Sequence, residues 1–163
     1  MNYLLIKFPN PILKKASEKV QAFSTDELRA LVRDMTETMY SNRGIGLAAN
    51  QIGVGMRAFS YNIDDEVGYI INPVIAELAG EPELVDEGCL SVPGFYFPRM
   101  RHPQALVTGV DLDGNAVKLS GTGLMAQALQ HEVDHLDGHL YIEGLSSEVK
   151  REAMRLIRLA PWY

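Results

Sequence analysis

Cysteine is almost absent from this sequence of 163 residues, which contains Cys89 alone. An internal disulfide is therefore excluded, and Cys89 is either a small buried hydrophobic residue or a metal ligand or nucleophile in a reducing compartment. The sequence also lacks an apolar run near the roughly 20 residues that a membrane-spanning helix needs. Its first apolar stretch is too short and wrongly flanked for a signal peptide, so we expect a cytoplasmic protein.

A basic excess is also lacking, because 15 Lys and Arg residues are outnumbered by 21 Asp and Glu residues and the net charge is −6. Binding to nucleic acid needs a clustered basic surface, so neither general nor sequence-specific nucleic-acid binding is expected. The sequence contains no internal repeat and no low-complexity segment. A chain of this length with 47% apolar residues can bury one core, and we expect a single domain over residues 1–163.

The most informative motif is His-Glu-Val-Asp-His at residues 131–135. Because an α-helix has 3.6 residues per turn, His131 and His135 would stack on one face and could hold one metal ion. Glu132 would lie close enough to take a proton from a water on that metal. The alternative is a pair of hydrogen-bonded core histidines, but it leaves a carboxylate unexplained on an otherwise apolar helix. The apolar flanks of this helix are Leu124, Met125, Ala126, Ala128, Leu129 and Leu136, and Gly138 is well placed to end it.

A catalytic metal site needs a third protein ligand, which this motif does not supply. The metzincin pattern requires a histidine where this sequence has Tyr141, and His139 comes two residues early. A thermolysin-like site would take a glutamate from a later helix; Glu152 is the nearest candidate, although the chain after His135 is short for that subdomain. Cys89 is the remaining candidate, because a thiolate with two imidazoles gives a tetrahedral site with one position for water.

Hydrophobic periodicity predicts helices and antiparallel strands, and we expect an α+β fold in which antiparallel sheets wrap around a central metal-binding helix, with an N-terminal helix region and a C-terminal helix. Ser24 and Glu27 form a capping box before an amphipathic helix that runs to about Ser41. Alternating patterns predict antiparallel strands, and the expected ranges are residues 58–63, 69–72, 74–76, 105–112 and 116–119, with residues 95–103 as a loop. A last helix is expected over residues 147–159, and it carries more basic than acidic residues. A solvated face is the simpler interpretation of this charge, and a docking surface for an anionic partner is the alternative.

Three segments of the sequence are informative together: Gly-Ile-Gly-Leu-Ala-Ala-Asn-Gln at residues 44–51, Glu-Gly-Cys-Leu-Ser at 87–91 and Gln-His-Glu-Val-Asp-His at 130–135. They resemble the three signature segments of peptide deformylases. Alone, the first segment is a weak signal: it could be a tight turn entering a strand, or it could line a site with Gln51 as an amide donor. All three are intact and in the family's order, and the resemblance covers most of residues 1–145.

The resemblance implies a metal-dependent hydrolase that removes the formyl group from the initiator methionine of nascent polypeptides. Cys89, His131 and His135 would hold one divalent metal ion. The family favours Fe²⁺, whereas ligand chemistry alone favours Zn²⁺, and Ni²⁺ and Co²⁺ are alternatives. Glu132 would act as general base, while the side-chain amide of Gln51 and the backbone N–H of Leu90 would stabilise charge on the formyl oxygen.

The resemblance further implies how the peptide is held. The substrate backbone would pair as an added strand with the segment around Ile45 and Gly46. Glu87 and Arg101 would be structural partners beside the metal. The expected methionine pocket involves Ile45, Val85, Leu124 and Ala128. Contact of the C-terminal helix with the ribosome stays open, because that helix varies within the family.

Two rival hypotheses compete with a deformylase. One is a zinc endopeptidase of the His-Glu-x-x-His type, with Glu152 as its third ligand. The other is a structural metal site that only staples the fold. Substitution of Cys89 separates a deformylase from the endopeptidase, since only the deformylase needs the thiolate as a metal ligand. Substitution of Glu132 separates a deformylase from the structural site, since a structural site needs no general base.

Overall fold

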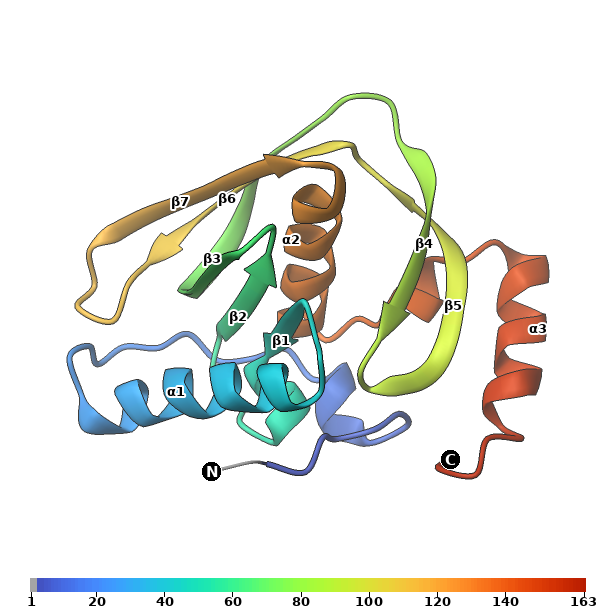
Figure 1. Ribbon diagram of the computed structural model, residues 1–163, viewed down its shortest axis with the longest axis horizontal. Coiled ribbons are helices and arrows are strands. Elements are labelled where there is room, and N and C mark those ends of the chain that lie inside the picture. Colours follow the sequence, from blue (N-terminus) through green and yellow to red (C-terminus); the bar gives the residue numbers. More distant parts are fainter. Residues whose placement is uncertain (1–2) are drawn as a thin grey trace.

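One buried helix, α2, lies between two antiparallel sheets (Figure 1). The structure is a computed structural model that describes residues 3–163. Five strands form the larger sheet in the order β1-β2-β3-β6-β7, and β4 pairs with β5 in a separate sheet. The elements are η1 (Pro11–Lys14), α1 (Asp26–Ser41), β1 (Gly46–Ala48), η2 (Ala49–Ile52), β2 (Ala58–Ile63), β3 (Glu66–Ala79), β4 (Glu83–Cys89), β5 (Val92–Arg101), β6 (Gln104–Val110), β7 (Ala116–Thr122), α2 (Gly123–Leu136), η3 (Tyr141–Gly144) and α3 (Ser147–Ile157).

The apolar residues of α2 hold it against the larger sheet. Leu129, Val133 and Leu136 are buried in one core with Phe59 of β2 and other sheet residues. Gly138 follows the helix with a φ of +84°, and a Cβ there would lie 2.7 Å from the carbonyl oxygen of Lys14. Glycine therefore ends this helix as predicted, and the α+β fold with antiparallel sheets around it is confirmed.

Two strand predictions need correction. Residues 95–103, predicted as a loop, lie mostly in β5, where Pro98 stands opposite Asp86 of β4. A strand with only one neighbour tolerates proline, because half of its backbone groups face a free edge. The predicted strands over 69–72 and 74–76 form one strand, β3, which runs through Pro73 with a register shift beside it. The prolines indicated breaks, but pairing with neighbouring strands overrode them.

The capping prediction for α1 is wrong by one residue. Thr25 is the N-cap, and its side-chain oxygen accepts a hydrogen bond from the Leu28 N–H at 3.1 Å. Ser24 instead has a φ of +57° and donates from its hydroxyl to Asp113 at 2.7 Å. The predicted end of the helix at Ser41 is confirmed.

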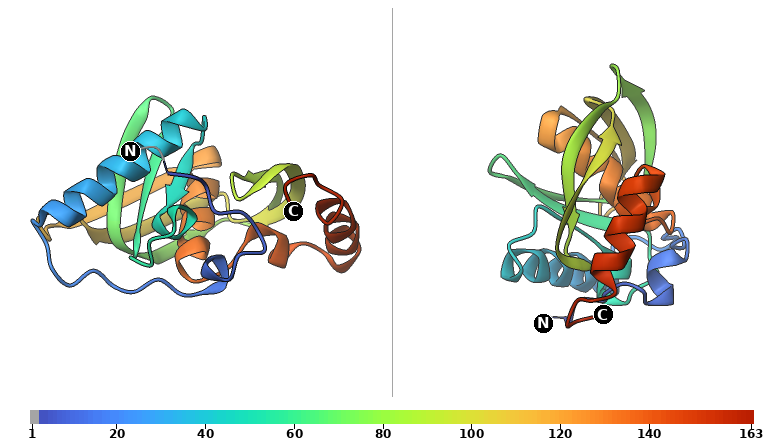
Figure 2. Two further views of the ribbon diagram at one scale, coloured as in Figure 1. Left: turned by 90° about the horizontal axis from the view of Figure 1, so that it is seen from below. Right: turned by 90° about the vertical axis from the view of Figure 1, so that its right-hand side faces the viewer.

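Helix α3 packs on the outside of β5 (Figures 1 and 2). Ala153 and Ile157 on its inner face are fully buried, in a second core that includes Phe97 and Tyr141. This core supports the β4–β5 pair from behind, so that the end of β4 is held firmly beside α2. Within residues 3–163, no helix is both long enough and apolar enough to cross a membrane.

Candidate active site

Three potential metal-binding atoms meet between α2 and the end of β4. The Sγ atom of Cys89 lies 3.2 Å from Nε2 of His135, and this nitrogen lies 3.2 Å from Nε2 of His131. The ligand atoms of the three residues all lie within 4.8 Å of one another. The two histidines are one helical turn apart, and Cys89 is the last residue of β4. The fold therefore brings together the three residues that the sequence proposes as ligands.

The environment of these atoms suits a divalent cation. Nδ1 of His131 donates to the Glu87 carboxylate at 2.8 Å, which leaves the Nε2 lone pair directed at the other two donor atoms. Burial lowers the pKa of His131, but hydrogen bonds with Cys89 and Glu87 raise it well above its ordinary value. The pKa of His135 is instead lowered well below its ordinary value by burial and by the charge of His131, so the His135 ring is neutral and can act as a metal ligand. One thiolate and two imidazoles are typical ligands of zinc or iron, and three protein ligands leave a position open for chemistry.

A buried ion-pair network holds His131 in this orientation. Arg101 donates to both oxygens of Glu87 at 2.8 and 2.7 Å and to Asp134 at 2.7 Å. Arg101 is 6% exposed and Glu87 is 2% exposed. Burial alone would raise the pKa of Glu87, but the hydrogen bonds from Arg101 and His131 lower it to about 2. Glu87 is therefore an ionised acceptor that fixes the tautomer of His131, as expected for a structural partner of a metal ligand.

We expect Arg101→Met to lower the free energy of unfolding by about 3–5 kcal/mol, because it leaves the buried Glu87 carboxylate without its main counter-charge. The double variant Glu87→Gln and Arg101→Met is expected to recover part of this loss. Urea denaturation of the two variants and the wild type measures both effects. A single variant as stable as the wild type would contradict the assigned role of this ion pair.

Glu132 lies beside the three ligand atoms and has no ion-pair partner in the part of the chain that the structure describes. It is 4% exposed, and its Oε2 atom is buried with no hydrogen-bond partner within residues 3–163. Burial raises its pKa to about 7, although the charge of His131 opposes the shift. A Cβ at Gly46 would overlap the Glu132 carboxylate, so any larger residue there would displace Glu132 from its position beside the cluster. A carboxylate with this pKa can accept and return a proton near neutral pH.

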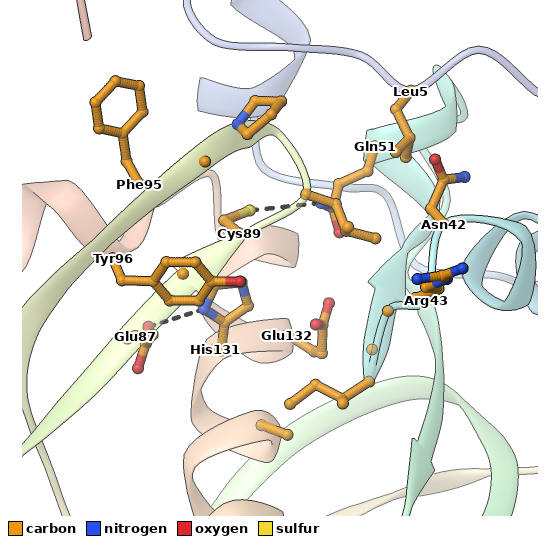
Figure 3. A pocket seen from close by; sticks show the side chains of 18 of the residues that line it. Leu5, Asn42, Arg43, Gln51, Glu87, Cys89, Phe95, Tyr96, His131 and Glu132 are labelled. Carbon is orange, nitrogen blue, oxygen red and sulfur yellow. Dashed lines mark hydrogen bonds and ion pairs between the residues drawn. The ribbon is translucent and has the colours of Figure 1, made fainter. Parts of the chain in front are cut away.

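The side-chain amide of Gln51 also faces the cluster (Figure 3). Its Nε2 atom lies 3.6 Å from Sγ of Cys89 and donates to the Ser91 hydroxyl at 3.0 Å. Its Oε1 atom accepts from the Ala48 N–H at 2.9 Å, which fixes the direction of the amide. Sequence reasoning did not assign a role to Ser91, although it is the last residue of the segment 87–91.

A cavity of about 630 Å³ opens above these residues. Four of the five residues expected to bind substrate line the cavity, namely Ile45, Gly46, Leu124 and Ala128. Leu90 lines it as well. Val85 is not among the lining residues, and its neighbours Asp86 and Glu87 take part instead. Sequence reasoning missed the rim residues Leu5, Lys7, Arg43, Phe95 and Tyr96, because no local pattern marks residues that converge only in the fold.

Comparison with known proteins decides the family. Residues 3–151 match the family model described as polypeptide deformylase. The chain belongs to the peptide deformylase family. It is 45% identical to the peptide deformylase of Acidothermus cellulolyticus over 95% of this chain and 85% of that protein. It is 43% identical to that of Mycolicibacterium paratuberculosis, with 94% of this chain and 86% of that protein covered.

Solved deformylase structures share the fold. The crystal structure of a peptide deformylase from Legionella pneumophila has a TM-score of 0.90 and 37% sequence identity, and covers 97% of this chain and 94% of that chain. That of Synechococcus elongatus in complex with actinonin has a TM-score of 0.90 and 34% identity, and covers 98% of this chain and 88% of that chain. The chain is thus a deformylase-type metal-dependent hydrolase, and its Cys-His-His cluster together with the family supports one divalent metal ion.

The endopeptidase hypothesis is not favoured for this deformylase. Glu152 lies on an exposed face of α3, where both of its oxygens accept hydrogen bonds from Arg155. His139 is exposed and paired with Glu143, as expected for a surface residue. Within residues 3–163, the group that could hold a metal ion is Cys89, His131 and His135.

Proposed function

We propose that the chain hydrolyses the N-formyl group of the initiator formyl-methionine of nascent polypeptides in the cytoplasm, releasing formate and a free amine. The observation that carries this proposal is the buried Glu132 carboxylate beside the Cys89, His131 and His135 cluster, at the floor of a cavity that opens to solvent. A structural site would need neither the carboxylate nor the cavity. The whole chain, residues 1–163, would form one catalytic domain.

Cys89, His131 and His135 would hold the metal, for which we propose Fe²⁺ from the family, with Zn²⁺, Ni²⁺ and Co²⁺ as alternatives that the same ligands accept. When bound, the metal supplies Lewis-acid chemistry that lowers the pKa of water and polarises a carbonyl. The Glu87 and Arg101 pair supports this role by keeping His131 in one tautomer.

Glu132 would move the proton. Its unpartnered Oε2 atom accepts a proton from the water that attacks the formyl carbon, and then returns that proton to the departing amine nitrogen. The water oxygen ends in formate, and the carbon–nitrogen bond breaks. The pKa of about 7, caused by burial, matches a group that must both accept and give a proton.

The amide of Gln51 and the N–H of Leu90 would donate to the formyl oxygen as charge develops on it. We expect Gln51→Leu to lower kcat/KM by about 10²–10³-fold, because it removes one such donor. The matched control is Ser91→Ala, which removes one hydrogen-bond partner of the Gln51 amide but keeps the amide itself. We expect Ser91→Ala to lower kcat/KM less than Gln51→Leu does. Steady-state formate release measures both variants, and a loss below threefold in Gln51→Leu would contradict this role.

The free edge of β1 would bind the peptide backbone. The Ile45 carbonyl accepts from the Asn62 N–H of β2 at 2.8 Å, so Ile45 occupies a hydrogen-bonded position of the ladder. In antiparallel pairs such positions alternate, so the N–H and C=O of Gly46 point away from β2. A peptide could add here as a strand, with its methionine side chain against Ile45, Leu124 and Ala128. Val85, which the sequence placed in the methionine pocket, does not line the cavity, so we do not include it among the residues that contact the methionine.

Contact with the ribosome through α3 rests only on the basic residues of this helix. Arg155 is already paired with Glu152, which reduces the charge available for an anionic partner. A solvated face remains the simpler interpretation.

The experiment that tests the function is formate release from formyl-Met-Ala-Ser. The sample is prepared anaerobically and saturated with metal, so that loss of Fe²⁺ cannot hide activity. We expect turnover of the formyl peptide and no cleavage of internal peptide bonds in an unformylated peptide. Absence of formate from a metal-saturated sample would refute the proposal.

A further inference from the structure

Arg43 occupies a backbone conformation that normally favours glycine. Its φ is +54°, directly after the C-cap of α1. Backbone hydrogen bonds fix this conformation: the Arg43 N–H donates to Tyr40 at 3.0 Å and the Gly44 N–H donates to Met39 at 2.9 Å. A residue with a Cβ is strained in this region, and such strain points to a use for the side chain that causes it.

The side chain of Arg43 lines the substrate cavity and has no ion-pair partner among the described residues, 3–163. Figure 3 shows Arg43 on the wall opposite Tyr96, with Glu132 and His131 between them. Lys7 is the other cation that lines the cavity. Within residues 3–163, no ion pair includes either residue, although the protein as a whole carries a net charge of −6. Arg43 and Lys7 therefore place two cations on the cavity lining that no ion pair among residues 3–163 neutralises, while the exposed carboxylate of Asp86 lies on the β4 side of the same lining.

The path of the peptide leads past this charge. Gly46 contacts Glu132 and is buried, whereas Arg43 is exposed, so the cavity becomes shallower from Gly46 to Arg43. A peptide that adds to β1 with its formyl end beside Gly46 would leave toward Arg43, because residues 47–52 on the other side of Gly46 are buried. Three residues of extended chain span about 10 Å at roughly 3.3 Å per residue. Counting methionine as the first residue, the second or third residue of the peptide would lie next to Arg43.

We propose that Arg43, assisted by Lys7, makes this enzyme prefer formylated peptides that carry a side-chain carboxylate at the second or third residue. The proposal rests on the proposed deformylase function and deepens it, because it names the class of substrate that the same cavity favours. The interaction lies away from the reacting atoms, so it changes KM and leaves the chemical step to Glu132 and the metal ligands.

The test compares three peptides, formyl-Met-Glu-Glu-Ser, formyl-Met-Gln-Gln-Ser and formyl-Met-Lys-Lys-Ser, each amidated at the carboxyl end so that only side chains carry the charge under test. At low ionic strength we expect the Glu peptide to exceed the Lys peptide in kcat/KM by about threefold to tenfold, the size of a partly exposed ion pair. The difference is expected in KM and is expected to shrink in about 0.5 M salt.

Variants assign the preference to Arg43. Arg43→Gln is expected to bring the Glu to Lys ratio close to one, and Arg43→Glu to invert it. Arg43→Gly is expected to raise the melting temperature while it removes the preference, which separates the strained backbone from the function of the side chain. Lys118→Gln is the control, because it makes the same charge change at an exposed position of β7 outside the cavity.

Equal kcat/KM for the Glu and Lys peptides would overturn the proposal, as would a preference that survives in Arg43→Gln. Either result leaves the deformylase function intact, because formate is still released. Absence of formate from all three peptides would instead refute the proposed function, and this proposal with it.

Discussion

Replacing Glu132 by glutamine is expected to lower kcat for formate release by about 10²–10⁴-fold, the range that general acid–base catalysis contributes. The variant keeps the size of the side chain, which is 4% exposed and lies against Gly46. It removes only the ability to accept the proton at Oε2. Glu132 is not one of the three clustered ligand residues, so we expect the variant to bind one metal ion per chain, like the wild type.

Glu152→Gln is the matched control for this variant. It makes the same chemical change on the exposed face of α3, where Glu152 is paired with Arg155. We expect full activity and full metal content, whereas an endopeptidase that uses Glu152 as a ligand would lose its metal. Metal analysis and formate release on the same samples separate the two cases. Activity of Glu132→Gln within tenfold of the wild type would refute the proton-transfer role.

Cys89→Ala is expected to weaken metal binding by well over 100-fold, because changes in residues that only support a ligand already cost about 10–100-fold. Activity should fall with the metal content. The fold should persist, because Cys89 is only half-buried and no disulfide depends on it. Titration with a competing chelator measures the affinity, and circular dichroism checks the fold.

The control for the cysteine variant is His139→Ala, which removes an exposed histidine outside the cluster. This variant is expected to keep its metal and its activity. Retention of tightly bound metal by Cys89→Ala would show that the third ligand is another residue. It would also revive the endopeptidase hypothesis.

The local features of the sequence predicted much of the arrangement at the metal cluster. The spacing of His131 and His135 requires only a helix, and the apolar residues around them made that helix clear. Cys89 was proposed from the ligands that a site needs, and the fold brings it within 3.2 Å of His135. These features depend on spacing and composition, which a sequence states directly.

Other features depend on contacts between distant segments, and sequence patterns did not show them. Pro98 indicated a loop, but pairing with β4 makes its surroundings a strand. Val85 belongs to a strand that does reach the cavity, yet its own side chain is not part of the lining. No sequence pattern singled out Arg43, because neither its backbone conformation nor its place at the cavity can be inferred from its neighbours in sequence.

The measurement that most directly tests the metal site is X-ray absorption spectroscopy of the metal-loaded protein. We expect one sulfur at about 2.3 Å and two imidazole nitrogens at about 2.0–2.1 Å if the metal is zinc, with the remaining position filled by oxygen from solvent. If the Cys89→Ala variant retains some metal, its X-ray absorption spectrum should lack the sulfur ligand. A first shell without sulfur, or one closed by a fourth protein ligand, would contradict the assignment of Cys89, His131 and His135 as an open catalytic site.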